Sequence, residues 1–192
     1  MKRVLNNGKK ILLIVDCDFD GVSSGTIFYS YVKDVSPNIE IVYLLHEGKA
    51  HGLSEHIENI ENDSEKYDLI VLPDSSSNDY EYHERLAKMN IPVLVLDHHL
   101  ADEEISSNAV IINNQLSPKY KNKELTGAGV TFQFCRYFDA KYGHNFASKY
   151  MDLAACGIIG DMGSMLEMEN RYIVCEGLKH INNKLLWALA QK

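Results

Sequence analysis

Residues 11–21 read Ile-Leu-Leu-Ile-Val-Asp-Cys-Asp-Phe-Asp-Gly, an apolar run that ends in three carboxylates spaced two residues apart. The run is rich in Val and Ile and shows no polar alternation, which is typical of a parallel strand covered on both faces. Four further apolar runs follow, at residues 39–45, 69–72, 93–96 and 109–112. Helical patterns lie between them, at residues 25–33, 54–60 and 80–89. This alternation predicts an α/β fold with a five-stranded parallel sheet sandwiched by helices.

The pattern changes after residue 112. Helical patterns occupy residues 130–142, 146–159 and 170–190, and the apolar spacing through Leu178, Ile181, Leu185 and Leu189 predicts that the last of these is one continuous helix. We therefore expect a helical C-terminal part after the sheet.

Composition narrows the class of protein. The chain has 192 residues, a net charge of -8 and 24% charged residues, which suits one globular domain and excludes collagen-like and disordered chains. The acidic balance argues against a protein that simply coats nucleic acid. No apolar stretch approaches the roughly 20 residues of a membrane span, so no membrane partner is expected. The four cysteines form no C-x-x-C pair, which favours a reduced, cytoplasmic protein.

Polar side chains follow three of the apolar runs. Asp16, Asp18 and Asp20 follow the first run, Asp74 follows the third, and Asp97-His98-His99 follows the fourth. Ligands of open parallel sheets bind beyond the carboxyl ends of the strands. If the segment after the first run is extended, its three carboxylates share one face. Carboxylates and imidazoles beside a helix N-terminus predict divalent metal ions that act on a phosphate.

Other interpretations of these residues are weaker. A single Asp after a strand is usually a turn or cap residue, but three successive strand ends favour a site. Residues 16–21 fit the start of an EF-hand loop, yet Ile27 stands at the twelfth position and a strand precedes the loop. A haloacid-dehalogenase-type phosphatase also places Asp-x-Asp after a strand. It needs no D-H-H triplet and usually pairs two acids where this chain has Asp161 alone, so it remains the weaker alternative.

In their order along the chain, these motifs resemble those of the DHH phosphoesterase family, and within it the RecJ-type single-stranded DNA exonucleases. The matching motifs are Asp16–Gly21, Asp74 with the serines after it, the triplet Asp97–His99, and Asp161. The segments Leu125–Val130 and Asn170-Arg171 resemble RecJ in particular. The resemblance runs along almost the whole chain.

The resemblance implies a site for two divalent ions, Mn²⁺ first and Mg²⁺ as the alternative. The implied metal ligands are Asp16, Asp18, Asp20, Asp74, His98 and Asp161. Asp18 binds one ion and Asp20 the other, Asp74 bridges both, His98 and Asp161 complete the second ion, and Asp16 ligates or supports the first. For catalysis, Asp97 orients an imidazole and His99 faces the substrate phosphate.

Further residues are candidates for substrate binding. Gly127 and Gly129 begin a helix that would receive a further phosphate, with close helix packing as the equal alternative. Arg171 contacts phosphate or caps a helix. His46 and His51 are expected to be surface residues. The matching RecJ segment tends to carry a basic and an aromatic residue there, and this departure leaves the role of the two histidines open.

The implied activity is a 5′-to-3′ exonuclease that releases nucleoside monophosphates from single-stranded DNA in repair or recombination. One alternative is the same site acting on oligoribonucleotides, cyclic dinucleotides or polyphosphate; another is a non-catalytic replication partner, which would have lost metal ligands. Residues 1–178 are expected to form the DHH catalytic domain and 179–192 to start a connecting or terminal helix. The family's second, substrate-binding domain is expected to be absent. The expected partners are single-stranded DNA and either that domain or a replication or repair protein.

Overall fold

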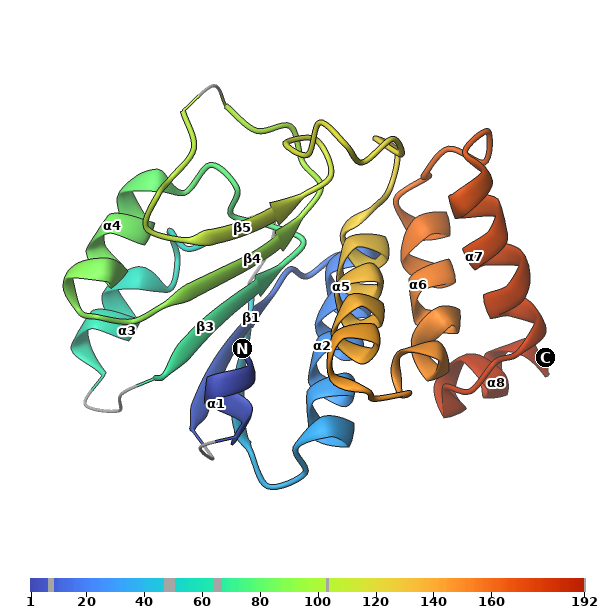
Figure 1. The fold of residues 1–192 in the computed structure, drawn as a ribbon, viewed down its shortest axis with the longest axis horizontal. Helices are drawn as coiled ribbons and strands as arrows, with labels where there is room; N and C mark the ends of the chain where they lie inside the picture. Colours follow the sequence, from blue (N-terminus) through green and yellow to red (C-terminus); the bar gives the residue numbers. More distant parts are fainter. Residues whose placement is uncertain (7–8, 47–50, 64–66, 103, 192) are drawn as a thin grey trace.

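The computed structural model describes residues 1–6, 9–46, 51–63, 67–102 and 104–191. The strands are β1 (Lys10–Val15), β2 (Glu40–Leu45), β3 (Leu69–Pro73), β4 (Val93–Asp97) and β5 (Val110–Asn113). The helices are α1 (Lys2–Asn6), α2 (Phe19–Val35), α3 (Ile57–Asn62), α4 (Tyr80–Lys88), α5 (Gly127–Tyr142), α6 (Met151–Gly160), α7 (Met168–Lys179) and α8 (Lys184–Ala190), with a 3₁₀ turn η1 (Ala147–Tyr150) before α6. Figure 1 shows their arrangement.

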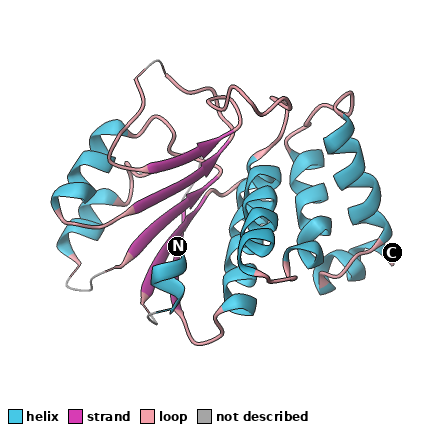
Figure 2. Cartoon of the chain, viewed as in Figure 1, coloured by secondary structure: helices cyan, strands magenta, loops and turns pink. Residues whose placement is uncertain are grey.

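The five strands form one parallel sheet in the order β2-β1-β3-β4-β5, which confirms the predicted fold class (Figure 2). β1 lies between β2 and β3, with Ile11 opposite both Ile41 and Leu69. Because all the strands run the same way, their carboxyl ends meet at one edge of the sheet. The polar residues that follow β1, β3 and β4 therefore arrive at that same edge.

Each face of the sheet is covered by helices, and the strand residues alternate between two apolar cores. Leu13 and Val71 pack with residues of α2, α5 and α6, whereas Leu12 and Ile70 pack with residues of α3 and α4. Figure 1 shows α3 and α4 on one side of the sheet, α2 and α5 on the other, and α6 and α7 forming a further layer. Burial on both faces explains why β1, β3 and β4 read as unbroken apolar runs, whereas the edge strands β2 and β5 are only partly buried. Within the described ranges, no helix combines the length and apolarity that a membrane crossing needs.

The prediction of one helix over residues 170–190 is wrong. The helix α7 ends at Lys179, and α8 begins at Lys184. The buried carboxylate of Asp152 in α6 accepts hydrogen bonds from the backbone N–H groups of Asn182 and Asn183, both at 2.7 Å, and so holds the chain in a non-helical conformation there. The side chain of Asn183 then caps α8 by accepting from Leu185 and Leu186.

Candidate metal centre

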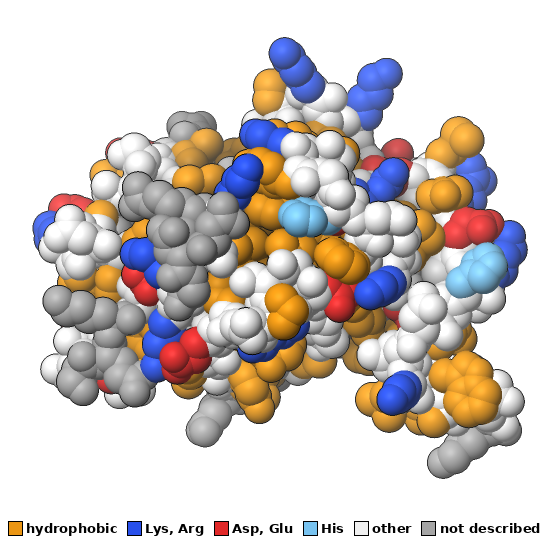
Figure 3. Space-filling view, turned by 60° about the horizontal axis from the view of Figure 1, so that its bottom comes forward, with side chains coloured by type: hydrophobic (Ala, Val, Ile, Leu, Met, Phe, Trp, Pro, Cys, Tyr) orange, Lys and Arg blue, Asp and Glu red, His pale blue; other side chains and the backbone are white. Residues whose placement is uncertain are grey.

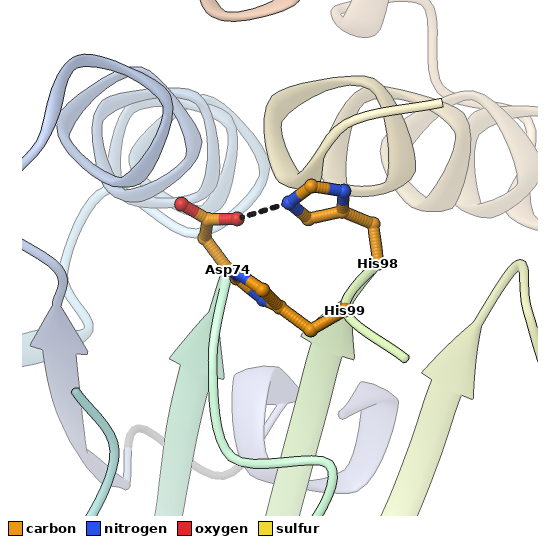
Figure 4. Close-up of side chains that lie close together, drawn as sticks. All are labelled: Asp74, His98 and His99. Atoms are coloured by element: carbon orange, nitrogen blue, oxygen red, sulfur yellow. Dashed lines mark ion pairs between the residues drawn. The ribbon is translucent and has the colours of Figure 1, made fainter. Parts of the chain in front are cut away.

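Asp74 stands directly after β3, in a conformation that few residues adopt. Its φ is 68°, in the left-handed region, and its side chain is almost fully buried. Its backbone N–H donates to the carbonyl of Leu96 at 2.8 Å, which ties this turn to β4. Figure 4 shows the carboxylate beyond the end of its strand, facing the imidazole of His98. Strain of this kind persists where the surroundings enforce it, and it is common at functional sites.

The six predicted metal ligands converge around Asp74. Three groups have potential ligand atoms within 4.8 Å of one another: Asp16, Asp18 and Asp74; Asp20, His98 and Asp161; and Asp74, His98 and His99. The first two groups match the two ion positions that the resemblance implies. Asp74 belongs to the first group and contacts His98 of the second, so it lies where a bridging ligand is expected.

His98 links the second group. Its Nε2 lies 3.2 Å from Oδ1 of Asp74, and 3.8 Å from Oδ2 of both Asp20 and Asp161. Asp161 follows the last residue of α6 and is more exposed than the others. One imidazole nitrogen thus faces three carboxylates from three different elements.

The three carboxylates of the first motif do not share one face of an extended segment, as the sequence suggested. Asp18 is the N-cap of α2 and accepts from the backbone N–H of Gly21 at 2.8 Å, and Asp20 already lies inside the helix. The helical turn sends Asp20 to one group and leaves Asp16 and Asp18 in the other. The split of these carboxylates between the two groups therefore follows from where α2 begins.

The N-terminus of α5 holds Asp20. Its carboxylate accepts from the Thr126 hydroxyl at 2.9 Å and from the backbone N–H groups of Gly127 and Ala128 at 2.7 and 3.0 Å. Gly127 and Gly129 are both buried, and a Cβ on Gly127 would lie 2.2 Å from Oδ1 of Asp74. These contacts favour close packing over the predicted phosphate contact, because the helix N-terminus already binds a carboxylate of the protein.

Asp16 is fully buried at the end of β1. Burial opposes its ionisation, but hydrogen bonds from His51 and the backbone of Cys17, together with the His46 imidazole 3.9 Å away, outweigh it, so the pKa of Asp16 lies below its ordinary value. The prediction that His46 and His51 are surface residues fails for His46, which is buried, and is incomplete for His51, whose half-exposed ring donates through Nδ1 to Oδ2 of Asp16.

The charges at the centre fit divalent cations. Burial raises the pKa of Asp20, while burial together with the nearby Asp20 and Asp18 carboxylates raises the pKa of Asp74 well above its usual range. Oδ1 of Asp74 is buried and has no hydrogen-bond partner among the described residues. Cations would satisfy that oxygen and offset the repulsion between the carboxylates. Oxygen donors with imidazole are also the ligands that Mn²⁺ favours.

Asp97 holds His99 at the edge of the centre. Its Oδ1 accepts from His99 Nδ1 at 2.8 Å and from the backbone N–H of His98 at 2.7 Å, and its Oδ2 accepts from the N–H of Ser77 at 3.0 Å. Burial opposes the ionisation of Asp97, but these hydrogen bonds prevail and hold its pKa far below the ordinary value. The hydrogen bond that His99 donates to Asp97 raises the pKa of His99. The imidazole is thereby oriented, and about half of it stays exposed.

The sequence did not reveal the roles of several supporting residues. Asn113, the last residue of β5, donates from Nδ2 to the His99 carbonyl at 2.9 Å and to the Ser77 hydroxyl at 2.8 Å. A polar residue at a fourth strand end was the available signal. Thr126 and His51 gave no such signal, because their partners are distant in sequence. Arg171 is exposed in the first turn of α7, and its phosphate contact stays a prediction.

Comparisons with known proteins agree with this geometry. The chain is 41% identical over 190 residues to the Bacillus subtilis (strain 168) protein named "Putative SPbeta prophage-derived single-strand DNA-specific exonuclease YorK", covering 99% of this chain and 32% of that protein. It is 28% identical over 183 residues to the single-stranded-DNA-specific exonuclease RecJ of Thermus thermophilus, covering 94% of this chain and 26% of RecJ. The chain therefore spans about a third or less of the length of these relatives.

Similar solved structures and a matching family model point to the same group of proteins. A crystal structure of exonuclease RecJ bound to manganese matches with a TM-score of 0.82 and 27% identity, over 94% of this chain and 46% of that one. The structure of RecJ from Thermus thermophilus in complex with Mn²⁺ matches with a TM-score of 0.78 and 26% identity, over 93% of this chain and 25% of that one. The model of the DHH family, N-terminal domain, matches residues 10–158. The chain belongs to the DHH family.

Proposed function

We propose that the protein is a two-metal phosphodiesterase, a RecJ-like exonuclease that releases nucleoside monophosphates from single-stranded DNA in the 5′-to-3′ direction. The convergence of the six carboxylate and imidazole ligands around Asp74 carries this proposal. Mn²⁺ is the ion we favour, since the donor set suits it and similar RecJ structures contain it. Mg²⁺ is the alternative ion, because the carboxylates offer it oxygen ligands.

In this proposal, Asp16, Asp18 and Asp74 hold one ion, and Asp20, His98 and Asp161 hold the other with Asp74. When bound, the ions would activate a water and offset charge on the phosphate. His99 contributes a hydrogen bond to a phosphate oxygen.

Asp97 prepares His99 for that task. Its carboxylate bonds Nδ1 of His99, so the ring keeps one orientation and presents Nε2 to the substrate. Supporting contacts of this kind typically contribute about 10–100-fold to activity. The His99 carbonyl is in turn held by Asn113, which limits movement of the same loop.

The remaining assignments also belong to the proposal. Residues 1–178 form the catalytic unit and residues 179–192 begin a connecting segment. A second domain, or a replication or repair protein, supplies further contacts to the DNA. The supporting observation is that the relatives are about three times longer than this chain. A cytoplasmic location and a role in DNA repair or recombination, which the sequence resemblance implies, are also part of the proposal.

The test uses one oligonucleotide labelled at its 5′ or its 3′ end, single-stranded or annealed, with Mn²⁺ and an excess of protein. We expect labelled mononucleotide from the 5′-labelled single strand in the first time points, and slower loss of the duplex. Asp74→Asn should reduce the rate by at least about 100-fold, because it removes the shared ligand.

Three results would contradict the proposal. The activity assignment fails if neither strand is degraded, or if Asp74→Asn degrades it as fast as the wild type. Faster turnover of short oligoribonucleotides, cyclic dinucleotides or polyphosphate in parallel reactions would keep the metal centre but overturn the assignment to single-stranded DNA.

A further inference from the structure

His51 contacts the candidate centre but is not one of its predicted metal ligands. Its Nδ1 donates to Oδ2 of Asp16, while the backbone N–H of Cys17 donates to Oδ1 at 2.6 Å. Both oxygens of this buried carboxylate therefore have a fixed donor. Each oxygen has further lone pairs, with which it can still bind a metal ion beside Asp18 and Asp74.

The backbone beside His51 is held by two hydrogen bonds to side chains. The carbonyl of Gly52 accepts from Nε2 of the buried His46 at 2.7 Å, and the N–H of Leu53 donates to Oδ2 of Asp79 at 2.7 Å. Gly52 has φ of 80°, and a Cβ there would lie 2.4 Å from the Asp79 carboxylate. A side chain at position 52 would be strained in φ and would clash, so this turn favours glycine.

His51 and His99 are held in the same manner. In each case Nδ1 bonds a buried carboxylate at a strand end, Asp16 for His51 and Asp97 for His99. Both imidazoles line one pocket of about 310 Å³, together with the serines that follow Asp74. A solvated surface histidine would not need a buried carboxylate or a fastened turn. The geometry therefore points to a defined task for His51.

We propose that His51 is a positioning residue for the first metal ion: its Nδ1–H holds the Asp16 carboxylate in the orientation in which it joins Asp18 and Asp74 around that ion. This inference rests on the proposed function only in so far as the centre binds divalent ions. Hydrogen bonds to a ligating carboxylate orient it and raise the affinity of the site. His51 itself does not contact the ion.

The test is calorimetric titration of Mn²⁺ into the metal-free protein and its variants. His51→Asn keeps an N–H donor close to the position of Nδ1, His51→Gln moves the donor to the position of Nε2, and His51→Leu removes it. His180→Leu, at the exposed end of α7, is the control for loss of a histidine. Thermal melts in EDTA check that each variant is folded, independently of metal and of activity.

We expect His51→Leu to weaken one of two Mn²⁺ binding events by about 10–100-fold and to leave the other unchanged. His51→Asn should restore most of the affinity, whereas His51→Gln should not. The inference is overturned if His51→Leu binds both ions as the wild type does, or if Asn and Gln behave alike. If the wild type binds two ions but hydrolyses no phosphodiester, the proposed activity is wrong, whereas the role of His51 still holds.

Discussion

The buried carboxylates of the centre lower the stability of the folded chain unless cations are bound beside them. Asp74 combines a left-handed backbone, a buried oxygen without a hydrogen-bond partner and a raised pKa. Each feature costs stability, and all three occur at one residue. A residue that violates several rules at once is typical of a functional site. The same site needs a glycine at position 127, because the helix α5 approaches Asp74 so closely.

Gly127→Ala tests that close approach. The added Cβ would lie 2.2 Å from Oδ1 of Asp74, so the carboxylate must move. We expect a stability loss of about 1–3 kcal/mol, and Mn²⁺ affinity lower by at least about tenfold. Gly129→Ala is the matched control, because its Cβ meets only the side chain of Leu125. Equal Mn²⁺ affinities for the two variants in calorimetry would contradict this account of Gly127.

His83 makes a separate prediction about pH. It is fully buried in α4, neither ring nitrogen has a hydrogen-bond partner among the described residues, and burial lowers its pKa although Asp79 opposes this. The unfolded state then binds a proton more readily than the folded state. Its contribution to stability is therefore complete above pH about 6.5 and is lost as pH falls, by up to about 1.4 kcal/mol per pH unit.

The check is urea unfolding of the wild type and of His83→Leu between pH 7.5 and 5. The variant should show a smaller loss of unfolding free energy over this range, since it removes the group that takes up the proton. Parallel pH profiles for the two proteins would show that His83 is not buried in its neutral form.

At the scale of elements, the strands were predictable and the helix ends were not. All five apolar runs match their strands to within one residue at each end, and in β1, β3 and β4 burial on both faces leaves a local signature. Helix α5 begins at Gly127 and not at 130, because its first turn binds Asp20, a residue 107 positions away. The break between α7 and α8 depends on Asp152, 30 positions before Asn182. Contacts over such distances leave no local pattern.

Asp152→Asn tests the break. The carboxylate accepts from the backbone of Leu153, Asn182 and Asn183, and an amide cannot accept all three through the same oxygens. We expect a loss of about 1–3 kcal/mol and faster proteolysis between α7 and α8. Asp34→Asn, which alters a more exposed contact to Lys149, should cost less than about 1 kcal/mol. Limited proteolysis with mass spectrometry and urea unfolding measure both effects, and equal losses in the two variants would contradict the capping role.

At the scale of the whole molecule, the net negative charge of the chain is connected with the candidate metal centre. Six acidic residues of a chain with net charge -8 lie in or beside the centre: Asp16, Asp18, Asp20, Asp74, Asp97 and Asp161. Their gathering was predictable, because the carboxyl ends of parallel strands lie at one edge of the sheet.

The apolar spacing near the C-terminus was predictable too, but the packing of these apolar side chains was not. Leu185, Trp187 and Leu189 are each more than half exposed. Apolar side chains lie beside polar and basic ones on the lobe at the lower right of Figure 3.

Replacing the Asp74 carboxylate should have opposite effects on stability with and without metal. It should not destabilise the metal-free protein, but it should reduce the stabilisation that bound metal provides. In EDTA, Asp74→Asn should melt at or above the wild-type temperature, since it removes a buried carboxylate whose pKa is raised. A single Mn²⁺ site at a hundredfold excess over its Kd adds about 2.7 kcal/mol, or at least about 5 °C for a domain of this size. Only the wild type should show the full rise. Equal rises in both proteins would place the stabilising ion elsewhere.

The central claim is that Asp74 lies between two bound divalent ions. Crystals grown with Mn²⁺ and measured at the manganese absorption edge test it directly, because anomalous peaks locate the ions without reference to activity. The account predicts two peaks about 3.5–4 Å apart, one beside Asp16 and Asp18, the other beside Asp20, His98 and Asp161, with Asp74 contacting both. A map with no peak at Asp74, or with peaks only elsewhere on the chain, would contradict it.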